Sequence, residues 1–507
     1  MSTTSPQAQA ARTLVLPLAL AQFIASYAGT NMNVAISTIA DDLNCSVSGI
    51  QATITFFTLT MASLMIPGSK LTDIWGRKTC FVWGLIIYGT GALLASFAQG
   101  LPLLIVSYSL LEGVGSALMI PPIYILITVA FKPVATRAKY FGVVGGAAGL
   151  GAAAGPLIGG VLTSGISWRA SFILQVLVVV VIIFLARGIV DPPRTGPAPH
   201  FDLGGAVLSA LGLFFIVFGV LQSGTFGWVK AREDLTIGGK VIISKGSISP
   251  VWVTMAIGLV FLAWCAWHLH RVERSGGTPL VALRLFRNRV SNLGLVTQNV
   301  QWLVLQGSFF VISVFLQQVR HYSAIETGLT LTPATIGILL ASALAERMAR
   351  RRKQAMLVRG GFVLTLLGMI LLLVLVRKDS NFAAYIPGLL SMGLGIGVML
   401  TASVNVVQSS FPESDQGDIS GVSRSVSNLG SSIGVALAGS ILVAAAAPGN
   451  KEYAIAVVIL AGFALVGLVA AMFIPAVRPG AVGVAGAGGT SPPVSSPVDE
   501  APRARRP

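Results

Sequence analysis

Apolar runs of about twenty residues recur along almost the whole chain, and this feature limits what the chain can fold into. A run of that length crosses a hydrocarbon core of roughly 30 Å as an α-helix. Only 10% of the 507 residues are charged, whereas a soluble domain carries roughly 25%. The alternating segments of roughly ten residues that a membrane barrel needs are absent from the sequence. We therefore expect an all-α protein that spans a membrane many times.

About fourteen runs are long and apolar enough to be spans. They fall into two blocks of six with a pair between them. The first block comprises about 14–36, 50–70, 79–97, 103–125, 138–163 and 168–190. The pair comprises about 203–222 and 251–270, and the second block about 290–317, 324–345, 357–376, 382–406, 420–446 and 453–474.

This spacing predicts five regions: an N-terminal segment (1–13), a six-helix bundle (14–190), a linker with two extra helices (191–289), a second six-helix bundle (290–475) and a tail (476–507). The formal net charge is +16, and the basic residues gather in alternate loops between the runs. The positive-inside rule explains this excess better than nucleic-acid binding does. It predicts a multi-pass protein of the inner or plasma membrane, with both termini cytoplasmic.

Two segments lie outside the predicted spans. Residues 228–250 are polar and surround a Gly-Gly pair, so they form either a small external hairpin or a disordered loop. Residues 476–507 are rich in Pro, Gly and Ser, which is typical of a disordered cytoplasmic tail.

A short segment repeats after the second span of each block. SKLTDIWGRK at 69–78 aligns without gaps with SALAERMARR at 342–351, sharing the acid, the leucine, a small residue and the following bases. Two matched halves are a feature of repeat-built transporters. A channel or a membrane enzyme gives no reason for this repeat.

The first of these segments resembles the loop signature between helices two and three of the major facilitator superfamily, in the fourteen-helix drug:proton antiporter group. A short loop needs a tight turn, which Gly76 supplies, and an acid there can accept hydrogen bonds from helix N-termini and bases. The resemblance implies a gate that latches the two halves on the cytoplasmic side. The alternative is a plain positive-inside loop. The gating residues are Asp73, Gly76, Arg77 and Lys78, with Glu346, Arg347 and Arg350 in the repeat.

GAAAGPLIGG at 151–160 is similar to the antiporter signature of the fifth helix in that group, which implies export. Glycines three and four residues apart let helices approach closely, and a proline can kink the helix. Ordinary small-residue packing is the alternative. Phe201–Gly204 and Gly227-Trp228 resemble the region of the central pair more weakly. The residues of the antiporter signature are Gly151, Gly155, Pro156, Gly159 and Gly160.

The usual embedded acid and base of this group are missing, because their positions are Ala28 and Ser109. Glu112 is the one acid well inside a predicted span, and Arg424 is expected nearer a cytoplasmic end. An ionised carboxylate in hydrocarbon is unfavourable, so we expect Glu112 to hold a proton until water reaches it. Three roles stay open for Glu112: proton coupling, contact with a cationic substrate, or a structural hydrogen bond.

Polar residues spaced by three or four mark one face of the first, fourth and ninth spans. Such a face meets protein or water rather than lipid. Substrate contact and structural hydrogen bonding are about equally good explanations. The candidates for a central cavity that would also hold Glu112 are Gln22, Ser26, Thr30, Asn33, Ser109, Ser116, Gln298, Gln301, Trp302 and Gln306.

These features predict a secondary active transporter that exports amphiphilic small molecules by alternating access, with the proton gradient as its driving force. The partners expected are membrane lipid and a small-molecule substrate, with no nucleic acid and a monomeric chain. No cofactor or metal is expected, because no phosphate-binding loop is present and the four histidines lie at span ends or in loops. The alternatives are a proton-independent facilitator, or an exporter of lipid or a metabolite. We do not expect an enzyme or an ion channel.

Overall fold

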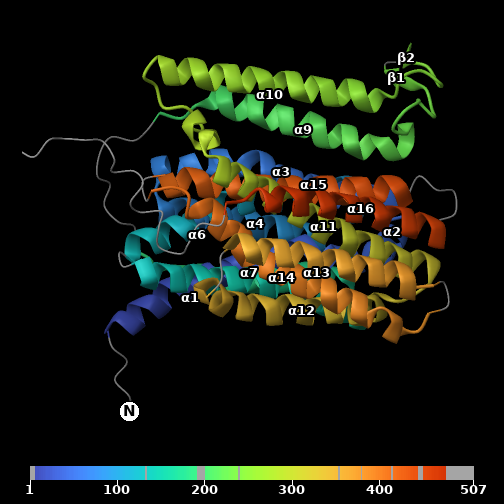
Figure 1. The fold of residues 1–507 in the computed structure, drawn as a ribbon, viewed down its shortest axis with the longest axis horizontal. Helices are drawn as coiled ribbons and strands as arrows, with labels where there is room; N and C mark the ends of the chain where they lie inside the picture. Colours follow the sequence, from blue (N-terminus) through green and yellow to red (C-terminus); the bar gives the residue numbers. More distant parts are fainter. Residues whose placement is uncertain are drawn as a thin grey trace, which may run out of the picture.

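The computed structural model describes residues 6–131, 134–190, 200–237, 240–351, 354–377, 380–412, 415–442 and 449–475. These residues include fourteen helices long and apolar enough to cross a membrane, as the sequence predicts. Figure 1 shows the long helices running side by side along one direction. The tail predicted at 476–507 lies outside the described residues.

Six spans form the N-terminal bundle, and two of them contain breaks in the regular α-helix. A 3₁₀ turn, η1 (Met32–Val34), follows α1, and a π-helical segment, η2 (Ile105–Glu112), joins α5 to α6. The α-helices are α1 (Pro6–Asn31), α2 (Ile36–Asp42), α3 (Val47–Trp75), α4 (Arg77–Ser96), α5 (Leu101–Leu104), α6 (Gly113–Ala130), α7 (Val134–Gly165) and α8 (Trp168–Ala186).

The C-terminal bundle also has six spans. Its α-helices are α11 (Arg289–Val314), α12 (Ala324–Arg351), α13 (Gln354–Leu375), α14 (Ile386–Gln408), α15 (Gln416–Leu442) and α16 (Asn450–Met472). The shorter segments are η3 (Leu283–Arg287), the π-helical η4 (Phe315–Val319) and η5 (Phe382–Ala384).

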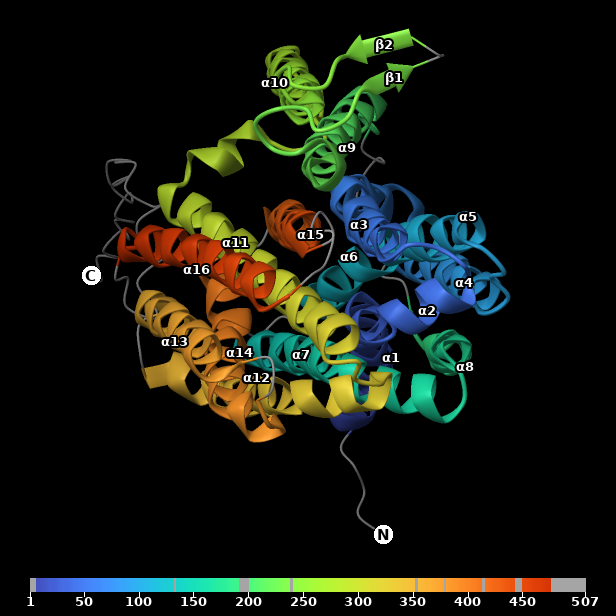
Figure 2. The ribbon, with the colours of Figure 1, turned by 90° about the vertical axis from the view of Figure 1, so that its right-hand side faces the viewer.

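The two bundles share one packing pattern, which is what the repeated segment predicts. In each bundle the first helix packs on the fifth, the second and third on the fourth, and the third on the sixth. The bundles meet through α3 with α15 and through α7 with α12. These two contacts exchange under a two-fold rotation that swaps the halves, because each joins a second helix to the other half's fifth helix. Figure 2 shows the two groups of helices end-on.

The distribution of polar and apolar side chains between surface and interior is reversed relative to a soluble protein. Large apolar side chains such as Phe184, Val260 and Phe473 are exposed on the outer helices. Serine, threonine and glutamine side chains are buried between helices instead. An apolar exterior is stable only in lipid, and small polar residues allow close helix contacts with interhelical hydrogen bonds. The chain is therefore a multi-pass membrane protein.

The extra pair, α9 (Leu203–Phe226) and α10 (Pro250–Arg274), lies outside both bundles. Its helix α9 packs against α3 and α15, and α10 packs on α9. Between them, β1 (Leu235–Ile237) and β2 (Lys240–Ile243) form an antiparallel hairpin. Of the two predictions for 228–250, the hairpin is the one that the structure has.

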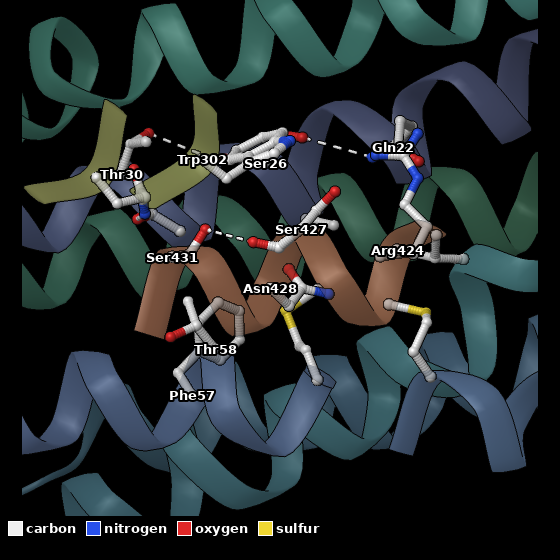
Figure 3. A pocket seen from close by; sticks show the side chains of 16 residues that line it. Gln22, Ser26, Thr30, Phe57, Thr58, Trp302, Arg424, Ser427, Asn428 and Ser431 are labelled. Carbon is white, nitrogen blue, oxygen red and sulfur yellow. Dashed lines mark hydrogen bonds between the residues drawn. The ribbon is translucent and has the colours of Figure 1, made fainter. Parts of the chain in front are cut away.

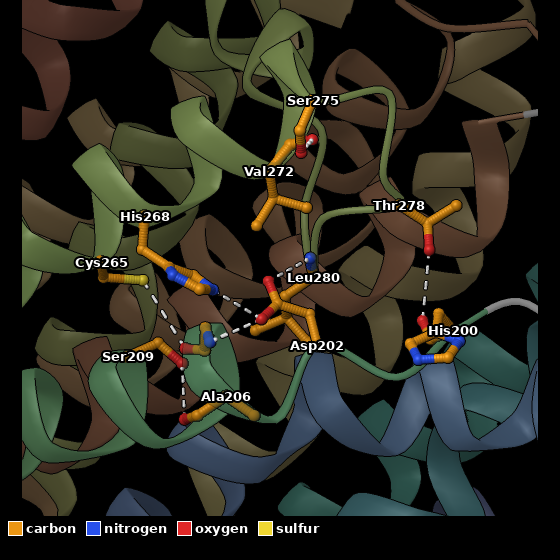
Figure 4. Close-up of polar contacts among 11 residues, drawn as sticks. His200, Asp202, Ala206, Ser209, Cys265, His268, Val272, Ser275, Thr278 and Leu280 are labelled. Carbon is orange, nitrogen blue, oxygen red and sulfur yellow. Dashed lines mark hydrogen bonds and ion pairs between the residues drawn. The ribbon is translucent and has the colours of Figure 1, made fainter.

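Asp202 fastens the start of the extra pair to its end. Its carboxylate accepts hydrogen bonds from the Gly205 N–H (2.8 Å) and the Leu280 N–H (3.1 Å) and contacts His268 Nε2 (2.8 Å), as Figure 4 shows. The first contact caps α9, the second holds the chain leading to the C-terminal bundle, and the third holds α10. Asp202 therefore joins α9, α10 and the segment that leads to the C-terminal bundle.

Candidate functional site

A cavity lies between the two bundles. Residues of α1, α3, α6, α11 and α15 line it, so both halves contribute to its wall (Figure 3). The lining residues are Gln22, Ala25, Ser26, Gly29, Thr30, Phe57, Thr58, Met61, Met65, Ile120, Trp302, Gln306, Arg424, Ser427, Asn428 and Ser431.

Five of the predicted cavity residues line this space. Gln22, Ser26 and Thr30 come from α1, where they share one face as their spacing predicts, and Trp302 and Gln306 come from α11. Gln22 Nε2 donates weakly to Ser26 Oγ (3.5 Å), and Gln306 Nε2 donates to the Gly29 carbonyl (2.8 Å). The last contact joins the two bundles within the cavity wall.

The other five are buried but are not among the residues that line this cavity. Gln298 donates to Ser427 Oγ (2.8 Å) and accepts from Ser423 Oγ (2.9 Å), which fastens α11 to α15. Gln301 contacts Ser403 of α14. These polar groups hold helices together, which is the alternative that the sequence left open. The other three residues are Asn33, Ser109 and Ser116, and Ser109 donates to the Thr53 carbonyl (2.7 Å).

The sequence pattern missed one whole wall of the cavity. Arg424, Ser427, Asn428 and Ser431 project from α15 at spacings of three and four (Figure 3). Arg424 was expected nearer a helix end, but the cavity reaches to its level. The Arg424 guanidinium donates to the Tyr124 hydroxyl and lies 4.9 Å from the centre of that ring. The signal available in the sequence was the polar stripe of α15 itself.

Glu112 does not line the cavity, which corrects the expectation that the pocket holds this carboxyl. It is completely buried inside the N-terminal bundle, beside Gly91 of α4. Neither of its carboxyl oxygens has a hydrogen-bond partner among the described residues, and the Tyr88 hydroxyl lies close by. The π-helical segment that ends at Glu112 explains the error, because its wider turns break the three- and four-residue spacing of an α-helical face.

Two tyrosines connect the surroundings of Glu112 to α1, the helix that lines the cavity. The Tyr88 hydroxyl lies 3.3 Å from the Ile24 carbonyl and also contacts Gln175 of α8. The Tyr108 hydroxyl donates to the Ala28 carbonyl (2.9 Å). Glu112 is therefore separated from the cavity by one helix, whose backbone its tyrosine neighbours hold.

Contacts between the halves close the cavity at both of its ends. At one end Gln317 bridges to η1 and α2, donating to the Asn33 carbonyl (3.1 Å) and accepting from the Ser37 N–H (3.0 Å). Gln51 of α3 donates to the carbonyls of Val435 (3.3 Å) and Ala436 (3.2 Å) on α15.

The opposite end carries the predicted gating loop. Lys70 Nζ lies 2.7 Å from Asp418 Oδ1, and Ser69 Oγ donates to the Gly417 carbonyl (3.2 Å), so the end of α3 is joined to the start of α15. Asp73 and Arg77 line a second cavity there, together with Lys70 and Asp418. Lys78 Nζ donates to the Arg187 carbonyl (3.1 Å) within the N-terminal half. Glu346, Arg347 and Arg350 lie on α12, but their side chains are outside the described part of the chain.

The glycines of the antiporter signature face two helices at very short range. A Cβ at Gly151 or Gly155 would overlap α1, and one at Gly159 would lie 3.1 Å from the Asn31 carbonyl oxygen. Gly160 faces the other half, where a Cβ would lie 2.6 Å from the Ala324 carbonyl oxygen. Pro156 is packed against Gly328 of α12. Residues 151–160 of α7 therefore pack at very short range against α1, which lines the cavity, and against α12 of the opposite bundle.

Comparisons with known proteins agree with this architecture. The chain is 30% identical over 422 residues to the probable actinorhodin transporter of Streptomyces coelicolor, covering 82% of this chain and 69% of that protein. It is 25% identical to the multidrug resistance protein Stp of Mycobacterium tuberculosis (82% and 72% covered) and 28% identical to the puromycin resistance protein of Streptomyces alboniger (86% and 82% covered).

Among solved structures, the human organic anion transporter MFSD10 matches with a TM-score of 0.57 at 14% identity, covering 92% of this chain and all of that one. At this identity the likeness is one of fold alone. The sequence profile of the Major Facilitator Superfamily matches residues 18–435. The chain, with its two matched bundles around a shared cavity, therefore belongs to the Major Facilitator Superfamily.

Proposed function

We propose that the chain is a secondary active transporter that exports amphiphilic small molecules by alternating access. The observation that carries this proposal is the position of the cavity, between two matched halves that touch at both of its ends. Breaking one set of end contacts while keeping the other exposes the cavity to one side of the membrane at a time. The relatives named as transporters or resistance proteins support export of small organic molecules.

We place the Gly76 end of the bundle in the cytoplasm, together with both chain termini. The bases of this end include Arg77 and Lys78 at the start of α4 and Arg284, Arg287 and Arg289 before α11. Basic residues are retained on the cytoplasmic side of a membrane. The chain would then work as a monomer in the inner or plasma membrane, with lipid around it and no cofactor.

Proton entry is the driving force that we propose, and Glu112 is the group that would carry the proton. A carboxyl buried without a hydrogen-bond donor is stable as the neutral acid, and its ionised form needs water or a donor. The tyrosines beside Glu112 hold α1 through the carbonyls of Ile24 and Ala28. Loss of the proton would therefore draw water or a tyrosine hydroxyl toward Glu112 and shift the helix that lines the cavity.

Transport driven by an imposed pH gradient tests this proposal. Purified protein in liposomes is given a fluorescent amphiphilic substrate, and uptake is followed with the interior acidic and with no gradient. In Glu112→Gln, gradient-driven uptake is expected to collapse while exchange without a gradient persists, because the amide cannot release a proton. Glu273→Gln changes an exposed acid at the end of α10 and should leave both rates unchanged.

Three results would each contradict a different part of this proposal. Full gradient-driven uptake in Glu112→Gln removes Glu112 from the proton pathway. Uptake by the unmodified chain that ignores the gradient leaves a proton-independent facilitator, the alternative that the missing embedded acid and base favour. Absence of uptake under both conditions, for amphiphiles of either charge, would reject export itself.

A further inference from the structure

The cavity contains one cation, Arg424, for which the described residues supply no counter-ion. Among the described residues, no carboxylate lies within ion-pair distance of Arg424. The two acids near the start of α15 pair with other bases: Asp415 with Arg284 (2.7 Å) and Asp418 with Lys70 (2.7 Å). Arg424 is half-buried, and a charge without a partner is unfavourable in a membrane interior. An unpaired arginine that is retained at a cavity wall therefore points to a partner that arrives from outside.

The charges of the lining residues favour an anionic ligand over a cationic one. None of the sixteen lining residues is acidic, and Arg424 is the only one that is basic. A cationic molecule would meet repulsion from Arg424 with no carboxylate to offset it, in surroundings where charges are poorly screened. An anionic group would instead remove the electrostatic penalty of the lone guanidinium.

The contacts of Arg424 leave hydrogen-bond donors for such a group. A guanidinium has five N–H donors, and only one nitrogen, Nη2, makes a hydrogen bond to a described residue, the hydroxyl of Tyr124. The Tyr124 ring lies 4.9 Å from the guanidinium carbon and restricts its position. The Tyr124 hydroxyl in turn donates to Gln22 Oε1 (3.3 Å) on α1. Arg424 is thus oriented by its neighbours while its other donors stay unused, as an anion-binding arginine requires.

We propose that this cavity binds amphiphilic molecules that carry an anionic group, such as a carboxylate, sulfonate or phosphate, with Arg424 as the anchor. The proposal rests on the export function above and names its substrate class. The apolar part of the molecule lies against Phe57, Met61 and Trp302, and Asn428, one turn from Arg424, adds an amide beside the anion. Flat aromatic side chains and a methionine accommodate apolar bodies of different shapes.

Tyr124 lines the cavity at the Gly76 end and contacts Arg424, which lines the central cavity. The Arg424–Tyr124 contact therefore lies between the space that holds the substrate and the space that leads toward the gating loop. An arriving anion accepts hydrogen bonds from the unused donors of the guanidinium, while the Tyr124 hydroxyl keeps the Arg424 side chain in place. Tyr124 is a positioning residue in this scheme, and Arg424 is the residue that binds.

Binding of three matched dyes tests the proposal. One fluorophore, a dansyl group, is attached through the same linker to a carboxylate, to its methyl ester or to a quaternary ammonium. Dissociation constants are measured by dansyl fluorescence on the full chain in lipid nanodiscs at fixed salt. We expect the carboxylate to bind at least tenfold more tightly than the ester, and the ammonium most weakly. Arg424→Gln should abolish this order, and Arg424→Lys should keep part of it.

Arg287→Gln is the matched control, because it removes the same charge at an exposed position outside the cavity. Arg287→Gln should bind the three dyes in the same order of affinity as the unmodified chain. Equal binding of the three dyes by the unmodified chain, tighter binding of the ammonium, binding of none of them, or an unchanged preference in Arg424→Gln would each overturn the proposal. If Arg424→Gln lowers the melting temperature and leaves the dye preference intact, the Arg424–Tyr124 contact is structural only.

Transport separates this proposal from the one on which it rests. Carboxylate-selective binding without transport of the bound dye supports the anion site and rejects export. Transport of the ammonium dye at the same rate as the carboxylate supports export and rejects the anion site.

Discussion

Gly76 separates α3 from α4 with a backbone conformation that only glycine adopts easily, φ +100° and ψ 150°. The turn is a single residue, because α3 ends at Trp75 and α4 begins at Arg77. This reversal carries Arg77 and Lys78 to the start of a helix while Lys70 and Asp73 stay on the last turns of the preceding one. The predicted need for a tight turn at Gly76 is confirmed by this geometry, and the role of the loop as a gate stays a proposal.

Gly76→Ala should lower the free energy of unfolding by about 1–3 kcal/mol, since a Cβ is strained in this region of backbone space. Gly145→Ala is the control, because it lies within α7 and a Cβ there would meet no atom within 4 Å. Alanine in a helix is expected to be neutral or stabilising. Thermal unfolding, followed by a thiol-reactive dye at the buried Cys80 and Cys265, measures both. Equal melting temperatures for Gly76→Ala and the unmodified chain would show that the turn relaxes.

At the scale of elements, the junction at Asp202 decides how the extra helix pair is attached. Burial raises the pKa of Asp202, but hydrogen bonds from the Gly205 N–H, His268 and the Leu280 N–H outweigh burial and bring the pKa below its usual value. The lowered pKa means that the folded state favours the ionised carboxylate. Stability from this junction is therefore complete above the unfolded pKa of about 3.9 and is lost as the pH falls through the lower folded value.

Asp202→Ala should loosen the start of α9 by about 1 kcal/mol through loss of the cap. Asp202→Asn keeps an acceptor oxygen, so it should retain much of the cap but none of the charge. Hydrogen exchange at the amides of Gly205 and Leu280 reports both effects. Lowering the pH from about 5 to about 3 should reduce the protection of these amides, measured against their intrinsic exchange rates, more in the unmodified chain than in Asp202→Asn. The same pH response in both proteins would show that the carboxylate charge contributes nothing.

At the scale of the molecule, weak contacts hold the ends of the cavity closed. The Lys70–Asp418 pair has side chains 20% and 25% exposed, and pairs of this kind contribute about 0.2–1 kcal/mol. The contacts of Gln317 and Gln51 at the opposite end are hydrogen bonds to backbone carbonyls and one backbone N–H. Weak contacts suit a transporter, because each end of the cavity must open in turn. Contacts of this strength can break at one end while the other end stays closed.

Asp418→Lys should open the Gly76 end, because it places two like charges opposite each other. Lys70→Asp combined with Asp418→Lys should restore closure with the charges exchanged. A cysteine at Ala25, in the cavity wall, is labelled from the Gly76 side with a charged thiol reagent that does not cross lipid. Labelling should become several-fold faster in the single variant and return toward the original rate in the double variant. An unchanged rate in Asp418→Lys would show that this pair does not hold the end closed.

Local rules were sufficient for the scaffold. Runs such as 203–222 and 251–270 predicted spans because length and apolarity alone decide what crosses a membrane. The glycines at 151–160 predicted a close helix contact, because the absence of a Cβ permits close approach whichever helix is the neighbour. The face formed by Gln22, Ser26 and Thr30 was also predictable, since α1 is a regular helix over those residues.

Local rules did not predict the cavity wall, because its composition depends on how distant helices pack. A polar residue such as Gln298 or Arg424 faces either a neighbouring helix or the cavity, and the choice depends on how α11 and α15 are rotated against each other. The π-helical turn before Glu112 turned this carboxyl into the bundle, away from the predicted face. The sequence by itself determined the number of spans, the matched halves and the family. Only packing between distant helices decided that the cavity holds an unpaired cation and that the buried acid lies behind its wall.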